Sequence, residues 1–171
     1  AGLWYHMDKL ESGIATSALV EQDPELNAYV RGVMCKVTQE YCGDIRLFII
    51  NQPYFNASMA PNGSMYLWTG FLLRAQNEDQ LAAVIGHEFA HYRHRHSLQQ
   101  FEMARATSEF LAFFSIATAG IGGGFVGLTA AIGGIGAIQG FSRDLEAEAD
   151  DQGLKLTIAQ GYNPVSYTHL T

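Results

Sequence analysis

The stretch His87-Glu88-Phe89-Ala90-His91 ends a run of helix-favouring sequence that starts at Asn77. Asn77 is a good helix N-cap, and the two acidic residues after it suit the positive end of a helix dipole. We therefore predict a helix in which both histidines lie on one face, a single turn apart. Two imidazoles placed in this way can bind one metal ion, and Glu88 can reach a nearby water molecule instead of the metal. This H-E-x-x-H pattern is typical of metal-assisted peptide hydrolysis.

A catalytic zinc site needs a third protein ligand and one open position. Further along, the chain reads Ser142-Arg143-Asp144-Leu145-Glu146-Ala147-Glu148-Ala149-Asp150, in which Ser142 can cap a second helix. Glu146 and Asp150 are four residues apart and so share a face of that helix. We assign Glu146 as the third ligand of one zinc ion per chain. Asp150 is then the acceptor for the outer N–H of a ligand histidine, and Glu148 is the weaker candidate ligand because it points elsewhere.

From Asn77 to His96 and from Ser142 to Asp150, the sequence resembles the zinc metallopeptidase family M48. The resemblance covers about residues 23–164 and is closest to a periplasmic branch of the family. It implies that zinc is bound by His87, His91 and Glu146, that Glu88 is the general base, and that Asp150 supports the site. It also implies a periplasmic or membrane-associated location in a bacterial envelope.

The expected fold is α+β and zincin-like (gluzincin), mostly helical, with a small three-stranded sheet beside the H-E-x-x-H helix. Strands are expected at residues 44–50, 54–59 and 64–69. The turn Pro61-Asn62-Gly63 separates the last two, and side chains alternate in the third. By the resemblance, an edge strand of this sheet binds the substrate backbone as an added strand. Asn56 and Ala57 match the family's strand motif and are candidate substrate-binding residues. The alternative is that both are structural strand residues.

The 171 residues are most simply one metallopeptidase catalytic domain. Residues 1–22 are expected to be an N-terminal extension with a short helix over residues 3–11. The glycine-rich residues 111–141 contain no charged side chain and are long enough for one transmembrane pass. A single pass would separate the two halves of the zinc site, so we expect a hairpin or loop that is buried, covers the site, or makes peripheral membrane contact. Residues 165–171 do not continue the expected helix, so we expect a truncated or non-native end there and assign it no function.

The net charge and the cysteine content exclude some classes of partner and metal site. The net charge of −7 argues against a nucleic-acid-binding surface. Cys35 and Cys42 do not form a C-x-x-C pair, so a cysteine zinc site is not expected. A disulfide between them, which would fit an oxidising compartment, and two free thiols remain equally open.

Together these features predict a zinc metalloendopeptidase with a polypeptide substrate, acting in envelope or membrane protein quality control. Two alternatives stay open: a chaperone-like outer-membrane assembly factor with latent protease activity, and a non-enzymatic membrane-associated scaffold with a chance motif. Peptide hydrolysis also needs a group that stabilises charge on the scissile carbonyl. Four residues are candidates for that role: His94, His96, Arg143 and Tyr162. For His96, a structural role is the favoured interpretation.

Overall fold

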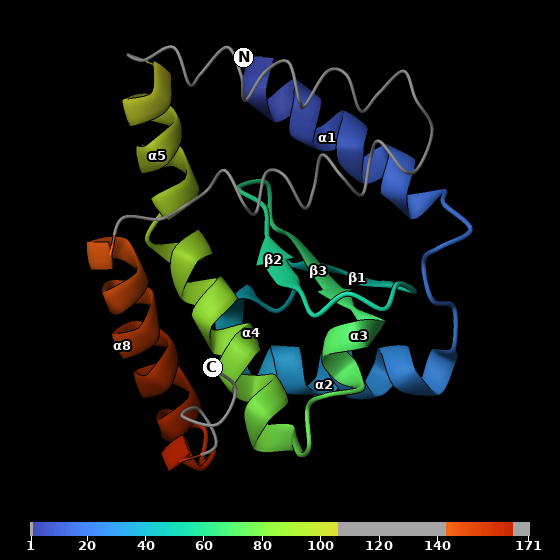
Figure 1. Cartoon of the computed structure of the whole chain (residues 1–171), viewed down its shortest axis with the longest axis vertical. Coiled ribbons are helices and arrows are strands. Elements are labelled where there is room, and N and C mark those ends of the chain that lie inside the picture. The colour runs from blue at the N-terminus through green and yellow to red at the C-terminus, as the bar shows by residue number, and fades with distance from the viewer. Residues whose placement is uncertain (1, 106–142, 166–171) are drawn as a thin grey trace.

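The computed structural model describes residues 2–105 and 143–165, which form helices around a small sheet (Figure 1). In chain order the elements are α1 (Gly2–Ala15), α2 (Pro24–Thr38), the 3₁₀ helix η1 (Gln39–Tyr41), β1 (Arg46–Ile50), β2 (Ala57–Met59), β3 (Ser64–Trp68), α3 (Thr69–Leu72), α4 (Glu78–Arg93), α5 (His96–Arg105) and α8 (Arg143–Ala159). The predicted α+β class, mostly helical with a three-stranded sheet, is confirmed. The expectations for residues 111–141, for Ser142 and for residues 166–171 fall outside the described residues.

Side-chain caps determine where α2 and α4 begin. The Asp23 carboxylate accepts a hydrogen bond from the Leu26 amide at 2.7 Å, and Pro24 occupies the first helical position. The Asn77 side chain accepts from the Gln80 amide at 3.0 Å. The predicted cap at Asn77 is therefore confirmed, and it sets the register of the helix that carries the H-E-x-x-H motif.

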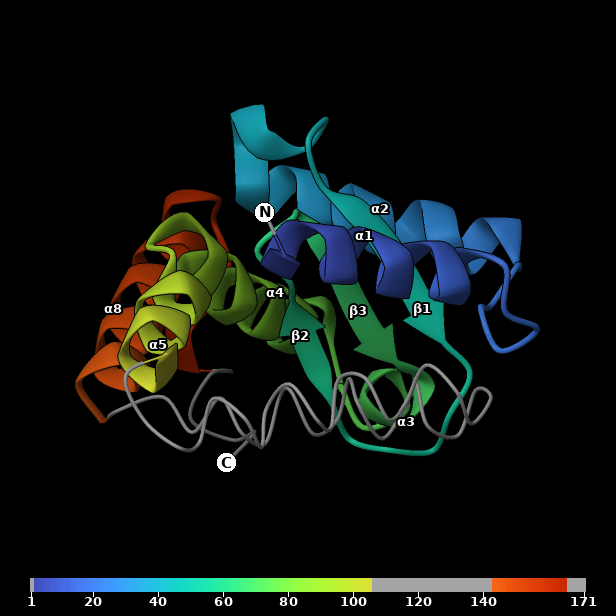
Figure 2. The same ribbon diagram turned by 90° about the horizontal axis from the view of Figure 1, so that it is seen from above.

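The sheet has the strand order β1-β3-β2, with β1 parallel and β2 antiparallel to the central β3. The outer edge of β1 is covered by the segment before α2, because the Glu21 amide donates to Ile49 and the Asn51 amide donates to Leu19. The strand β2 forms the other edge, next to α4 (Figure 2). It is shorter than predicted because residues 54 and 55 would pair with positions 69 and 70, where the chain has already turned into α3.

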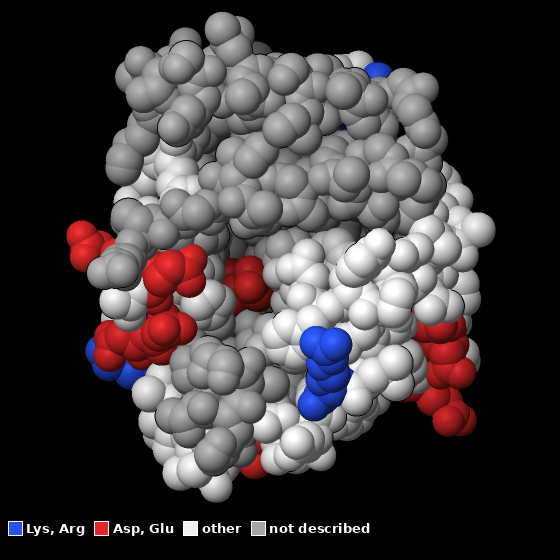
Figure 3. All heavy atoms as spheres, in the orientation of Figure 1, with Lys and Arg blue, Asp and Glu red and all other residues white. Residues whose placement is uncertain are grey.

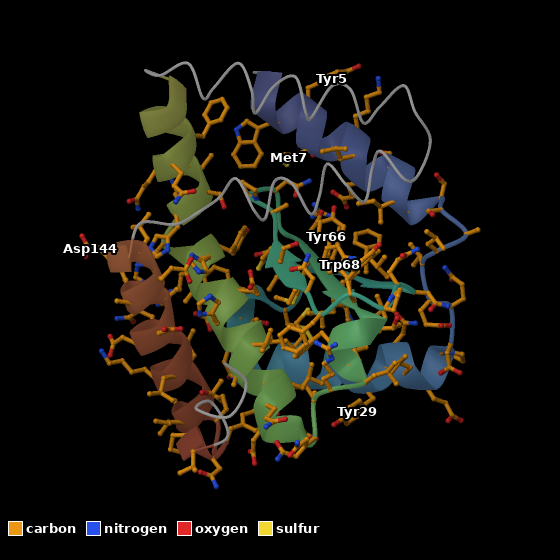
Figure 4. All side chains as sticks on the ribbon, in the orientation of Figure 1. Tyr5, Met7, Tyr29, Tyr66, Trp68 and Asp144 are labelled. Carbon is orange, nitrogen blue, oxygen red and sulfur yellow. A yellow bond between two sulfur atoms is a disulfide. The ribbon has the colours of Figure 1, made fainter. Side chains whose placement is uncertain are left out.

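Both faces of β3 are buried. On one face, Met65 and Leu67 pack with apolar residues of α2 and α4. On the other face, Tyr66 and Trp68 (Figure 4) pack with Ile14 of α1. This burial explains why α1 continues to Ala15 instead of ending near residue 11 as predicted.

A disulfide joins Cys35 in α2 to Cys42 just after η1, with the two Cα atoms 4.6 Å apart. Of the two possibilities left open by the sequence, the bonded one is therefore correct. Within residues 2–105 and 143–165, no helix is both long enough and apolar enough to cross a bilayer.

Candidate metal centre

The helix α4 presents His87 and His91 on one face, as their spacing predicts. Their Nε2 atoms are 3.0 Å apart and point toward a common position. His91 is only 2% exposed. Burial, with repulsion from the neighbouring His87 and His96, lowers the pKa of His91 to about 3. His91 is therefore neutral near pH 7, the form in which an imidazole binds a metal.

The helix α8 brings Glu146 to the same position. Its Oε2 lies 3.5 Å from His87 Nε2, and its Oε1 lies 3.7 Å from His91 Nε2. Two ligand atoms at tetrahedral angles around zinc, each at roughly 2.0–2.1 Å, are about 3.4 Å apart. Two imidazole nitrogens and one carboxylate at these separations therefore fit a zinc ion with one open position.

Two glycines explain why α8 can approach α4 so closely. A Cβ atom on Gly153 would lie 2.7 Å from the His87 backbone nitrogen, and one on Gly86 would lie 2.9 Å from the Gly153 carbonyl oxygen. Glu146 is two helical turns before Gly153 on the same side of α8. The glycine contact therefore sets the distance from Glu146 to the two histidines.

Asp150 lies on the same face of α8, one turn after Glu146. Its Oδ1 is 2.8 Å from His87 Nδ1, the ring nitrogen on the far side from the ligand atoms. An ionised carboxylate can only accept, so Nδ1 carries the proton and Nε2 keeps its lone pair for a metal. The structure therefore places Asp150 where the sequence predicts it.

Glu88 is partly buried and faces the sheet. The Met59 amide of β2 donates a hydrogen bond to its carboxylate. Burial, and secondly repulsion from Glu146, raise the pKa of Glu88 to about 8, and the Met59 hydrogen bond only partly opposes this rise. A carboxyl group with such a pKa can both take up and release a proton near neutral pH.

The edge strand β2 turns some of its backbone groups toward the site. The Trp68 amide donates to the Asn56 carbonyl and the Ala60 amide donates to the Ser64 carbonyl, so positions 56, 58 and 60 pair with β3. In an antiparallel ladder the residues between them point their N–H and C=O groups away from the partner strand. Ala57 therefore faces outward, as does Met59, whose amide reaches Glu88. Asn56 instead uses its carbonyl inside the sheet.

The sequence did not predict a second cluster beside the first. His96 Nδ1 lies 2.9 Å from His91 Nδ1, and His96 Nε2 lies 3.3 Å from Glu148 Oε2. His94 Nδ1 is 3.0 Å from the other Glu148 oxygen. The signal in the sequence is the repetition of histidine after the motif, but its meaning depends on the turn at Arg95, where φ is +58°.

The candidates for transition-state stabilisation lie at different distances from the cluster of His87, His91 and Glu146. Tyr162 donates to Glu78 Oε1 at 3.0 Å, at the first residue of α4. Glu78 is nine residues before His87, or about 13 Å along a helix, so Tyr162 lies away from the cluster. His94 and His96 lie against Glu148. The side chain of Arg143 falls outside the described residues.

The sequence of the chain is similar to a known protein family and to several curated proteins. The model of peptidase family M48 matches residues 20–170. The mitochondrial metalloendopeptidase OMA1 of Schizosaccharomyces pombe is 35% identical over 118 residues, which cover 69% of this chain and 34% of that protein. The putative beta-barrel assembly-enhancing protease of Vibrio cholerae is 30% identical over 156 residues, 84% of this chain and 32% of that protein. The beta-barrel assembly-enhancing protease of Escherichia coli is 26% identical over 159 residues, 86% of this chain and 32% of that protein.

The chain therefore spans about a third of the length of these curated relatives. The family match nevertheless covers most of the chain and includes the whole cluster of His87, His91 and Glu146. Since that cluster also has the ligand types and separations of a metallopeptidase centre, the chain belongs to peptidase family M48.

Proposed function

We propose that residues 1–171 are the catalytic domain of a zinc metalloendopeptidase. The observation that carries this proposal is the convergence of His87 Nε2, His91 Nε2 and a Glu146 oxygen within 4.8 Å of one another. An accidental H-E-x-x-H pattern would not bring a carboxylate from a helix more than fifty residues away to the same point. Family membership supports a catalytic metal, and the nitrogen and oxygen ligands favour zinc.

In this proposal His87, His91 and Glu146 hold the zinc ion, and Asp150 orients His87 through its outer N–H. Zinc supplies Lewis acidity, which polarises the scissile carbonyl and makes water a better nucleophile. Because His91 is buried and neutral, it needs no deprotonation before it binds. The chain therefore presents a ligand set that is ready for the metal.

Glu88 is the general base. Its raised pKa makes the carboxylate basic enough to take a proton from the attacking water. The same carboxyl group then gives that proton to the leaving amine. The Met59 amide keeps Glu88 turned toward the edge strand, and the substrate bond would lie between that strand and the histidines.

The substrate is a polypeptide that adds to the outer edge of β2 as a further strand. Ala57 offers outward-facing backbone N–H and C=O groups for this pairing. Asn56, which precedes Ala57, pairs with Trp68 of β3 and so holds the start of this edge in place. Recognition through backbone groups would accept many sequences, as a quality-control peptidase requires.

The disulfide between Cys35 and Cys42 favours an oxidising compartment. Together with the likeness to proteins named beta-barrel assembly-enhancing protease, it supports a periplasmic or membrane-associated location in an envelope. The substrates would then be envelope or membrane proteins.

The test compares wild type, Glu88→Gln and Glu146→Ala for zinc content and for cleavage of an unfolded polypeptide such as casein. We expect about one zinc per chain in wild type and in Glu88→Gln, with cleavage only in wild type. Glu146→Ala should lose both zinc and activity. The matched control is Glu40→Gln, which changes an exposed glutamate of η1 and should leave both unchanged. Equal cleavage by wild type and Glu88→Gln, or no zinc in wild type, would overturn the proposal.

A further inference from the structure

A chain of close polar contacts, one hydrogen bond and one ion-pair contact, leads from the buried ligand histidine to a carboxylate that is not itself a ligand. It runs from His91 Nδ1 to His96 Nδ1 at 2.9 Å, and from His96 Nε2 to Glu148 Oε2 at 3.3 Å. The three side chains come from α4, α5 and α8. His96 is 0% exposed, so its ring cannot exchange these partners for bulk water.

Binding of a metal determines which ring nitrogen of His91 and of His96 carries the proton. A neutral imidazole carries one N–H, and His91 must leave Nε2 without a proton because that atom faces His87 Nε2 and Glu146. His91 Nδ1 then carries the proton and donates it to His96 Nδ1. His96 in turn carries its proton on Nε2, which faces the Glu148 carboxylate at 3.3 Å.

We propose that His96 and Glu148 are positioning residues that hold His91 in the Nδ1–H tautomer and so keep its Nε2 available for the metal. This inference rests on the proposed zinc site. It gives α8 the same task toward both ligand histidines: Asp150 accepts directly from His87, and Glu148 acts on His91 through His96. Carboxylates that orient ligand imidazoles raise metal affinity in the same way elsewhere.

The same residues could be taken for a second metal site, because ligand atoms of His94, His96 and Glu148 also lie within 4.8 Å of one another. A metal on His96 Nε2 would force the proton of that ring onto Nδ1. The Nδ1–H groups of His91 and His96 would then face each other at 2.9 Å, which is repulsive. Neutral imidazoles therefore allow a metal in only one of the two clusters at a time. When the His87–His91–Glu146 site is occupied, the other cluster supports the orientation of His91.

His94 has a separate place in this scheme. It contacts the second oxygen of Glu148, so it steadies the carboxylate but lies outside the chain from His91 to Glu148. Substitution of His94 should therefore barely affect zinc binding at the first site. In a second metal site, by contrast, the same substitution would remove a ligand. His94→Ala thus separates the two interpretations.

The first test needs no substitution. Long-range ¹H–¹⁵N correlation spectra of the zinc-loaded, ¹⁵N-labelled protein report which ring nitrogen of each histidine carries hydrogen. We expect Nδ1–H for His91 and Nε2–H for His96. An Nδ1–H signal from His96, or a second bound zinc in place of its Nε2 proton, would overturn the proposal.

The second test measures zinc affinity by competition with a chromophoric chelator. His96→Leu removes the acceptor and should weaken zinc binding about 10–100-fold. His96→Asn places an amide oxygen where Nδ1 lies and should recover most of that loss, whereas a purely structural role would not distinguish these variants in this way. Glu148→Ala should also weaken binding, with partial recovery in Glu148→Gln; this half-exposed position tolerates substitution should His96→Leu fail to fold.

The outcomes distinguish this inference from the proposed function. Zinc bound as tightly by His96→Leu and Glu148→Ala as by wild type would refute the positioning role and leave the zinc site intact. Two zinc ions in wild type and one in His94→Ala would establish a second metal site instead. No zinc in wild type would remove the proposed function, and the inference with it.

Discussion

Asp150 and Asp151 are adjacent in sequence, but only Asp150 contacts a histidine of the candidate metal centre. Asp150 accepts from His87 at 2.8 Å, whereas Asp151 pairs with Lys155 at 2.6 Å between two exposed side chains. We predict that Asp150→Asn, which weakens the acceptor, raises the zinc dissociation constant about tenfold or more. Asp151→Asn removes only an exposed ion pair and should leave that constant unchanged. Chelator competition on both proteins measures the difference, and an equal loss in the two would show that charge alone matters.

Glu88 should make the stability of the metal-free protein depend on pH. Its pKa in the folded chain is about 8, above the ordinary value of 4.5. The unfolded chain therefore loses this proton between about pH 4.5 and 8 while the folded chain retains it. The contribution of protonated Glu88 to the free energy of unfolding is fully present below pH 4.5. It falls as the pH rises through this window, by up to about 3 kcal/mol at pH 7.

Glu88→Gln should abolish this loss. We expect the free energy of unfolding of the metal-free variant to exceed that of wild type at pH 7.5 and to match it near pH 4. Urea unfolding at several pH values measures the difference between the two proteins, in which the opposite contribution of His91 cancels. A difference that does not grow with pH would contradict the raised pKa.

At the residue scale, the sequence predicted which side chains lie together where they are a fixed number of residues apart on one helix. His87 with His91 and Glu146 with Asp150 are pairs four residues apart on helices, and helical geometry alone makes each pair share a face. The contacts of Met59 with Glu88 and of His96 with Glu148 could not be predicted. They depend on how β2 lies beside α4 and on the turn at Arg95, and neither is encoded in a local repeat.

At the scale of elements, the crossing of α4 and α8 is a backbone-to-backbone contact. Gly153→Ala would place a methyl group 2.7 Å from the His87 nitrogen and 2.9 Å from its Cα atom, with no flexible side chain to move aside. We predict that the helices separate, that stability falls by about 1–3 kcal/mol, and that zinc affinity falls because Glu146 moves away from the histidines. Gly32→Ala is the matched control, since a Cβ at this exposed position of α2 meets nothing within 4 Å.

Gly32→Ala should raise stability by roughly 0.5–1 kcal/mol, as expected for a glycine in a helix interior. Thermal unfolding of the two variants measures the expected loss and gain of stability, and zinc titration measures the expected loss of affinity in Gly153→Ala. If Gly153→Ala destabilised the fold yet kept full zinc affinity, the crossing would not be what positions Glu146.

The outward-facing Ala57 amide gives a test of the edge strand. Proline at an edge position whose N–H faces away from the sheet costs no ladder hydrogen bond. We therefore predict that Ala57→Pro folds and binds zinc like wild type but has a raised KM for a polypeptide substrate, because one backbone donor is lost. Kinetics on casein-derived peptides measure this effect. An unchanged KM would show that the substrate does not pair with this part of β2.

The bounds of the elements show which features local sequence patterns can predict and which they cannot. The cap residue Asn77 and the acidic residues after it predicted the start of α4. The end of α1 was missed because the burial of Ile14 against β3 is a long-range contact. The length of β2 was missed because it is set by where its partner β3 ends.

At the scale of the whole molecule, α8 is held at its two ends by different means. Its C-terminal end is tied to the start of α4, where Tyr162 donates to Glu78 and the Asn163 amide donates to Asp79. Its N-terminal end meets α4 and α5 through acidic side chains and histidines. Acidic residues gather over α8 on the face shown in Figure 3. A cation bound in the proposed site would offset the mutual repulsion of these carboxylates and would join this end of α8 to α4.

Removal of zinc should therefore loosen one end of α8 more than the other. A site filled at 100 times its dissociation constant contributes about 2.7 kcal/mol to folding, and this contribution acts where Glu146 and Asp150 reach the histidines. We predict that chelation lowers the melting temperature and speeds hydrogen–deuterium exchange of amides 147–152 well above that of amides 155–160. Glu146→Ala should show the same pattern without chelator and no further change with it. Uniform exchange along α8, or a chelator effect that persists in Glu146→Ala, would mean that zinc stabilises the molecule through other residues.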